Sequence, residues 1–296
     1  MIEKERALKR FLYFPVLAAL LTVLLAGCSG GQDSVSSLDG VPIAFQKIGS
    51  GDRTLVLVHG WCCDQGYWVD QVPEFSKNFT VVTLDLAGHG DSGTGRQEYT
   101  VDAFAADVAA VVSALDLHNV YLVGHSMGGP VVVEAAGLLA DRVVGVIGID
   151  TLQELGWNLP QNQIDGFMKP MEADFYGVTK KFVKTMFPAG ADTALVRQVS
   201  EDMASAPAEV GISAMRHMLK HDLKPTLARL NVPIWCLDAN QNPVDFQAWS
   251  IYKPGYTAIL MEGVGHFLFM ERPGEFNTKL LELIDRMENR PRQIQN

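Results

Sequence analysis

Cysteine is scarce in this chain: its 296 residues include only Cys28, Cys62, Cys63 and Cys236. No histidine or cysteine cluster at ligand spacing accompanies the adjacent Cys62 and Cys63, which argues against a metal or redox centre there. Lipidation of Cys28, considered below, would leave an odd number of thiols, and these cannot all pair. We therefore expect no structural disulfide framework, and the sequence implies no metal or organic cofactor.

Positive charge is also in short supply. The chain carries 24 Lys and Arg against 34 Asp and Glu, a formal net charge of −10. A domain with this balance repels the phosphates of nucleic acids and anionic lipid headgroups. Nucleic acid is therefore excluded as a partner, whereas the 48% hydrophobic content supplies ample material for a buried core.

A long apolar run occupies residues 11–26, behind a basic segment that includes Lys4 and Arg10, and polar residues follow from Ser29. Basic, apolar and polar segments in this order predict a signal peptide. The alternative is an uncleaved membrane helix, for which the run is slightly short.

The end of this run, Leu-Ala-Gly-Cys at residues 25–28, resembles the lipobox of bacterial lipoproteins, in which the cysteine is lipidated. The resemblance implies that residues 1–28 are a signal peptide with its lipobox and that Cys28 anchors the protein to a membrane. Residues 29–38 would then be a flexible tether. We expect the folded part to be extracytoplasmic in a bacterium.

The most informative motif of the chain is residues 121–129, Tyr-Leu-Val-Gly-His-Ser-Met-Gly-Gly. Its apolar beginning predicts a buried strand, and the Val-, Ala- and Leu-rich residues 130–140 predict a helix, so Ser126 lies where a strand turns into a helix. Gly124 and Gly128 suit such a turn because side chains there would clash. The pattern is typical of a nucleophile elbow.

Two further motifs agree with the elbow. Residues 54–58 predict a buried strand that ends in His59-Gly60-Trp61, and Gly263-Val-Gly-His266 follows the last predicted strand. In this order the three motifs resemble the α/β-hydrolase family over about residues 40–289. The resemblance implies an α/β fold with a mostly parallel, doubly wound sheet.

The hydrophobic pattern supports this fold. Predicted strands (41–48, 54–58, 80–84, 121–125, 142–150, 233–238 and 256–261) alternate with predicted helices (67–77, 100–117, 130–140 and 276–287). We expect 41–48 to pair antiparallel with 54–58, and Thr100 to cap its helix. The hydrolase core would comprise residues 39–151 and 226–290.

Strand signals are missing between residues 152 and 225. Amphipathic segments rich in Phe, Met and Trp alternate there with prolines, which predicts an inserted helical lid. Because such a lid faces the carboxyl edge of the sheet, some of its apolar side chains should line a substrate pocket. Trp157 and Phe175 are two candidates.

The residues and the family resemblance together imply nucleophilic catalysis. His266 would accept the proton of Ser126, and Ser126 would attack a carbonyl carbon. By resemblance to the family, the backbone N–H groups of Trp61 and Met127 would form the oxyanion hole. His125 and His89 are interpreted as packing and loop-bracing residues.

The acid of the triad is less obvious. The family usually places it after the seventh strand, where this chain has Asn242, and an amide cannot supply the charge. Asp238 and Asp245 lie on either side of that position and remain alternatives. A minority of the family carries the acid after the sixth strand, which here is Asp150, and we favour Asp150.

These features predict a carboxylic-ester hydrolase that acts on small, fairly apolar esters. Lactonase, perhydrolase and amidase activities use the same machinery and stay open. Dehalogenase and epoxide hydrolase activities are disfavoured because relatives with them carry Asp at the elbow. The missing acid at Asn242 leaves a second class, a non-catalytic membrane-tethered binding protein on a hydrolase scaffold.

Overall fold

The computed structural model describes residues 33–139, 141–155 and 158–289. Its centre is an eight-stranded sheet in the order β1-β2-β4-β3-β5-β6-β7-β8. β2 pairs antiparallel with β1 and β4, and all other neighbours are parallel. The predicted α/β class and mostly parallel sheet are confirmed. The strands are β1 (Asp33–Ser36), β2 (Pro42–Ile48), β3 (Thr54–Val58), β4 (Thr80–Leu84), β5 (Val120–His125), β6 (Val143–Ile149), β7 (Ile234–Ala239) and β8 (Thr257–Met261).

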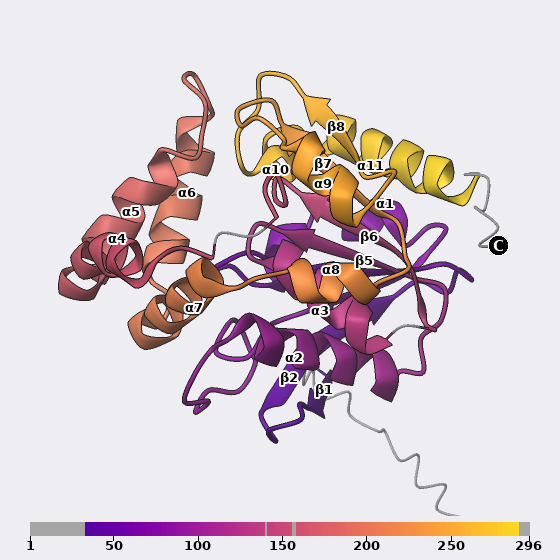
Figure 1. Cartoon of the computed structure of the whole chain (residues 1–296), viewed down its shortest axis with the longest axis horizontal. Helices are drawn as coiled ribbons and strands as arrows, with labels where there is room; N and C mark the ends of the chain where they lie inside the picture. The colour runs from indigo at the N-terminus through magenta and orange to yellow at the C-terminus, as the bar shows by residue number, and fades with distance from the viewer. Residues whose placement is uncertain (1–32, 140, 156–157, 290–296) are drawn as a thin grey trace, which may run out of the picture. The chain divides into compact units, whose positions relative to one another are not determined.

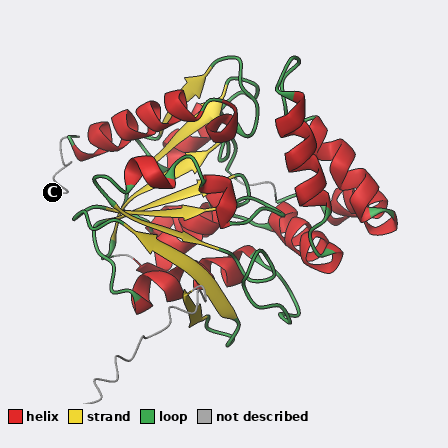
Figure 2. Cartoon of the chain, turned by 180° about the vertical axis from the view of Figure 1, so that it is seen from behind, coloured by secondary structure: helices red, strands yellow, loops and turns green. Residues whose placement is uncertain are grey.

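Helices cover both faces of this sheet (Figure 2). On one face α2 packs against α3, and α3 packs against β5, β6 and α8. On the other, α11 packs against β7 and α1 against β4 (Figure 1). The helices around the sheet, apart from those between β6 and α8, are the 3₁₀ helix η1 (Gln65–Trp68), α1 (Val72–Phe75), α2 (Val101–Ala114), α3 (Gly128–Leu139), α8 (Lys224–Arg229), α9 (Phe246–Tyr252), α10 (Leu268–Glu271) and α11 (Pro273–Glu288).

The central strands are buried on both faces. Every residue of β3, β4, β5 and β7 is buried, which explains their continuous apolar runs. The predicted cap of α2 is also present: Oγ1 of Thr100 accepts a hydrogen bond from the N–H of Ala103 at 3.0 Å. Local sequence signals and burial therefore agree through the core.

Four helices without an intervening strand follow β6 and precede α8 in the described residues: α4 (Gln161–Ala173), α5 (Phe175–Lys184), α6 (Thr193–Ala204) and α7 (Ala208–Lys220). They lie together beside the sheet (Figure 1), where α4 packs on α5 and α7, and α5 packs on α6. We call them the cap helices. Because they are inserted between the end of β6 and the start of β7, the cap helices lie at the carboxyl ends of the parallel strands.

The expected pairing of residues 41–48 with 54–58 was wrong. β2 instead pairs with β4, with Phe45 opposite Leu84. β3 has no free edge, because β4 and β5 flank it as parallel partners. The fully buried β3 takes the centre, which leaves the half-exposed β2 near the sheet's edge.

Two other expected ranges need correction. The helix expected at 67–77 is split into η1 and α1. Pro73 has no N–H with which to continue a preceding helix, and it lies instead in the first turn of α1, where no such bond is needed. The tether expected at 29–38 contains β1, which adds to β2 at the edge of the sheet. Residues 33–36 are therefore part of the fold.

The predicted signal peptide and Cys28 lie outside the described residues. In the part of the chain that is described, no helix is both long enough and apolar enough to cross a membrane.

Candidate active site

Ser126 lies at the sharp turn between β5 and α3. Its backbone has a positive φ of 53°, a conformation that is uncommon for any residue with a side chain. Three hydrogen bonds hold it there: the Ser126 N–H donates to Ile149 O at 3.1 Å, and Ser126 O accepts from Gly129 N at 2.9 Å and Thr151 Oγ1 at 2.8 Å. The strained turn is thus fixed by β6 and by the residues that follow it.

The glycines of the elbow are required by close backbone contacts. A Cβ on Gly124 would lie 2.2 Å from Gly128 O, and one on Gly128 would lie 2.7 Å from Val58 O. Gly60 is restricted less strictly and by side chains: its Cβ would lie 2.9 Å from His125 Nδ1 and 3.2 Å from the Ser126 Cβ. The end of β3 therefore sits directly against the elbow.

His266 and Asp150 are brought together from distant parts of the chain. Nδ1 of His266 lies 2.5 Å from Oδ2 of Asp150, and both side chains are largely buried. The other oxygen of Asp150 accepts a hydrogen bond from the N–H of Ala239 at 2.9 Å. Since Nδ1 faces the carboxylate, Nε2 is the ring nitrogen left for proton transfer.

The loop that carries His266 is fastened on two sides. The His266 N–H donates to Met186 O at 2.9 Å, and the Gly265 N–H donates to Glu271 Oε1 at the same distance. A Cβ on Gly265 would meet Met186 O at 2.4 Å. The segment after α5 therefore takes part in positioning the histidine.

The two alternative acids do not hydrogen-bond to His266. Asp238 is on β7 and completely buried, where its Oδ1 accepts from the Thr151 N–H at 3.2 Å and its Oδ2 has no partner among the described residues. Burial, and then the charge of Asp150, raises the pKa of Asp238 well above its usual value and favours its neutral form. Asp245 is exposed and caps α9 by accepting from the Ala248 N–H.

Two backbone N–H groups beside Ser126 have no acceptor in the described part of the protein, those of Trp61 and Met127. Both residues are buried next to the elbow. The Trp61 indole donates to Gly211 O of α7 at 2.7 Å, which connects this loop to the cap helices. The pair is available to an anionic oxygen bound at Ser126.

Ser126, Asp150 and His266 line one cavity of about 510 Å³. Most of its other walls are apolar. The cap contributes Phe182 from α5, Met186 from the segment just after α5, and Met218 from α7. Phe175 does not line it but packs edge-on against Trp61, with ring centroids 5.9 Å apart. Trp157 lies outside the described residues.

His125 and His89, the two histidines interpreted from the sequence as packing and loop-bracing residues, have structural contacts. The His125 ring packs on His266 at a centroid distance of 4.6 Å and hydrogen-bonds to its backbone O. Burial lowers the pKa of His125 well below the usual value and lowers that of His89 to about 3, so both rings are neutral. Nδ1 of His89 bonds to Ala87 O within its own loop.

Sequence reasoning missed two residues of this site. Thr151 reaches back to the Ser126 carbonyl, and His221, at the end of α7, lines the cavity. The place of Thr151 directly after Asp150 could have pointed to it, whereas nothing near His221 in the sequence indicates the cavity. Burial also raises the pKa of Cys62, Cys63 and Cys236, all free thiols.

The profile of the alpha/beta hydrolase family matches residues 55–279. This is more than half of the chain, and the chain belongs to that family. Family and relatives together support an enzyme of the hydrolase type.

One relative is a pimeloyl-[acyl-carrier protein] methyl ester esterase of Edwardsiella ictaluri, 28% identical over 258 residues that cover 81% of this chain and 96% of that one. Another is the dihydrolipoyllysine-residue acetyltransferase component of the acetoin cleaving system of Pseudomonas putida, 28% identical over 251 residues. These cover 81% of this chain but only 65% of that protein.

Among solved structures, an esterase from Exiguobacterium antarcticum has a TM-score of 0.76 at 20% identity. The match covers 86% of this chain and all of that one. At this identity the likeness shows the shared fold.

The close contact at Gly124 predicts a large loss of stability in Gly124→Ala. The new methyl group would lie 2.2 Å from a backbone oxygen that cannot move without opening the elbow, so we expect a cost of about 3 kcal/mol in the free energy of unfolding. Gly166→Ala in α4 is the matched control, because its Cβ would meet nothing within 4 Å. It should stabilise by roughly 0.5–1 kcal/mol. Urea denaturation of both variants measures the difference, and equal effects would contradict the prediction.

Proposed function

We propose that this protein is a serine hydrolase that cleaves small, fairly apolar carboxylic esters through Ser126, His266 and Asp150. The observation that carries the proposal is the 2.5 Å contact between His266 Nδ1 and Asp150 Oδ2 in the cavity that Ser126 lines. A base held by a carboxylate in the same cavity as a half-buried elbow serine is the arrangement that nucleophilic acyl transfer requires.

In the proposed reaction, Nε2 of His266 takes the proton of the Ser126 hydroxyl as Oγ attacks the carbonyl carbon. The carbonyl oxygen of the substrate becomes an oxyanion, which the backbone N–H groups of Trp61 and Met127 stabilise by about 3 kcal/mol per donor. Asp150 stabilises the imidazolium ion. The imidazolium then protonates the leaving alcohol, and water, activated by the same histidine, releases the acid from Ser126.

The substrate class follows from the cavity. Its size and mainly apolar walls favour an uncharged acyl or alcohol group of modest length. The esterase relative in Edwardsiella is named for a methyl ester substrate, which is consistent with ester chemistry on this scaffold. Lactones, peracids and amides would meet the same catalytic groups, and a substrate panel separates them.

A fluorophosphonate probe tests the serine, and p-nitrophenyl esters test turnover. We expect the probe to label Ser126 in the native protein and to leave Ser126→Ala unlabelled. Asp150→Asn should reduce ester turnover by about 10⁴, because the imidazolium loses its counter-charge and the ring loses its orientation.

Asp238→Asn and Asp245→Asn are the matched controls and should each cost far less. Circular dichroism confirms that the variants are folded. Near-full activity in Asp150→Asn would exclude it as the acid, and a folded protein that neither reacts with the probe nor turns over any ester would favour the binding-protein alternative.

The cap residues on the cavity wall should set the preferred chain length. Phe182→Ala removes a large apolar wall, so kcat/KM for a p-nitrophenyl octanoate should fall by roughly 10–200-fold relative to the acetate, which is too short to reach it. Tyr176→Ala, on the exposed side of the same helix, should leave the ratio unchanged. Equal losses for both esters in Phe182→Ala would mean that Phe182 is structural.

We also propose that the enzyme works outside the cytoplasm as a lipoprotein anchored through Cys28. Membrane affinity would come from the buried methylenes of the acyl chains and not from contacts with the fold. Cys28→Ser should therefore move the protein from the membrane fraction to the soluble fraction, while kcat of the purified protein stays unchanged. Membrane retention of Cys28→Ser would overturn the anchor.

A further inference from the structure

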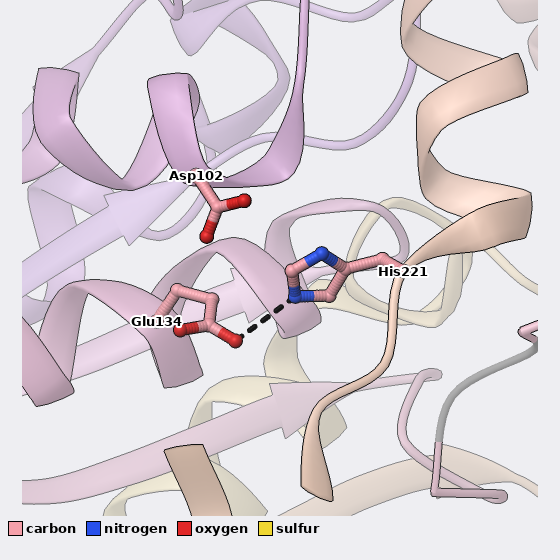
Figure 3. A group of neighbouring side chains, drawn as sticks. All are labelled: Asp102, Glu134 and His221. Carbon is pink, nitrogen blue, oxygen red and sulfur yellow. Dashed lines mark hydrogen bonds and ion pairs between the residues drawn. The ribbon is translucent and has the colours of Figure 1, made fainter. Parts of the chain in front are cut away.

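Asp102, Glu134 and His221 converge beside the cavity from three separate elements (Figure 3). Asp102 is in the first turn of α2, Glu134 is in the middle of α3, and His221 caps the end of α7. Their potential ligand atoms all lie within 4.8 Å of one another. The catalytic proposal uses none of the three.

The cluster has an excess of negative charge. Glu134 is only 7% exposed, and two carboxylates face a single imidazole. The one ion-pair contact from Lys or Arg to Glu134 or Asp102 among the described residues is Arg229, whose Nη2 is 4.0 Å from Glu134 Oε2 and whose side chain is mostly exposed. A bound cation would stabilise the buried carboxylate of Glu134.

The positions of the donor atoms suit a metal ion. Nε2 of His221 lies 2.9 Å from Oε1 of Glu134, and two ligands about 2.1 Å from a zinc ion at 90–109° are themselves separated by about 3.0–3.4 Å. Asp102 is exposed, so its carboxylate can turn to close the remaining gap. We propose that Asp102, Glu134 and His221 bind a divalent first-row transition ion such as Zn²⁺, with water as a fourth ligand.

The surroundings would hold the ligands in place. Oε2 of Glu134 accepts a hydrogen bond from Thr226 Oγ1 at 2.5 Å, and this hydroxyl accepts one from Arg229 at 2.8 Å. Such outer contacts orient a ligating carboxylate. The ion would replace the present His221–Glu134 hydrogen bond: Nε2 binds as the deprotonated nitrogen, and the neutral ring keeps its proton on Nδ1.

The site would join the cap helices to the core. His221 ends α7 and also lines the substrate cavity, whereas Asp102 and Glu134 belong to helices that cover the sheet. A metal ion bound here would fix the end of the cap against α2 and α3. Its role would be structural, with no part in the proposed acyl transfer.

The experiment uses the tag-free full-length protein after chelator treatment. Zn²⁺ is titrated by calorimetry, Tm is measured with and without Zn²⁺, and Co²⁺ supplies a visible absorption signature of coordination. We expect one Zn²⁺ per chain and a higher Tm. Asp102→Asn and His221→Asn should each weaken binding at least about tenfold and reduce the Tm shift.

Glu209→Gln is the matched control, because Glu209 is likewise an exposed acid in a first helical turn but lies outside the cluster. It should bind Zn²⁺ as the native protein does. If His221→Asn fails to fold, the zinc affinity of Asp102→Asn is the test, because Asp102 is exposed and its replacement leaves the packing unchanged. Absence of saturable Zn²⁺ binding, or native affinity in Asp102→Asn, overturns the proposal, and neither result depends on whether the protein hydrolyses esters.

Discussion

The contact between Asp150 and His266 is the interaction on which the candidate site depends. It joins the end of β6 to the loop after β8, and it forms only because β6, β7 and β8 run parallel and end at the same edge of the sheet. Ser126 directly follows the neighbouring strand β5 and donates its N–H to Ile149 O at the end of β6. The sheet's strand order therefore places Ser126, His266 and Asp150 in one cavity, although they are far apart in sequence.

The cap helices take part in this arrangement as well as covering it. Met186 O accepts a hydrogen bond from the His266 N–H, and Gly211 O accepts one from the Trp61 indole, so both residues are bonded to backbone of the cap. Movement of α5 or α7 would consequently shift His266 and Trp61 directly. A ligand that orders the cap would also order these two residues.

The buried acidic groups Asp150, Asp238 and Glu134 have different hydrogen-bonding environments. The carboxyl group of Asp150 is bonded to the His266 imidazole and to a backbone N–H. Asp238, one strand away, has an oxygen without a partner, and burial favours its neutral form. Glu134 faces His221 and a hydroxyl. The charge of Asp150 contributes to the raised pKa of Asp238, so these two groups are coupled electrostatically.

Local signals in the chain were enough for the elbow at Ser126, the order of strands and helices, and the histidine after the last strand. These depend on glycine geometry and hydrophobic periodicity over a few neighbouring residues. Local signals did not predict that β2 pairs with β4 or that the helix expected at 67–77 is interrupted before Pro73. They also did not show which cap side chains face the cavity. Three carboxylates stayed open as partners of His266 until the strand ends were placed. The cluster of Asp102, Glu134 and His221 left no mark in the sequence, because side chains on α2, α3 and α7 become neighbours only when the helices pack on the sheet, and packing is decided by contacts between distant segments.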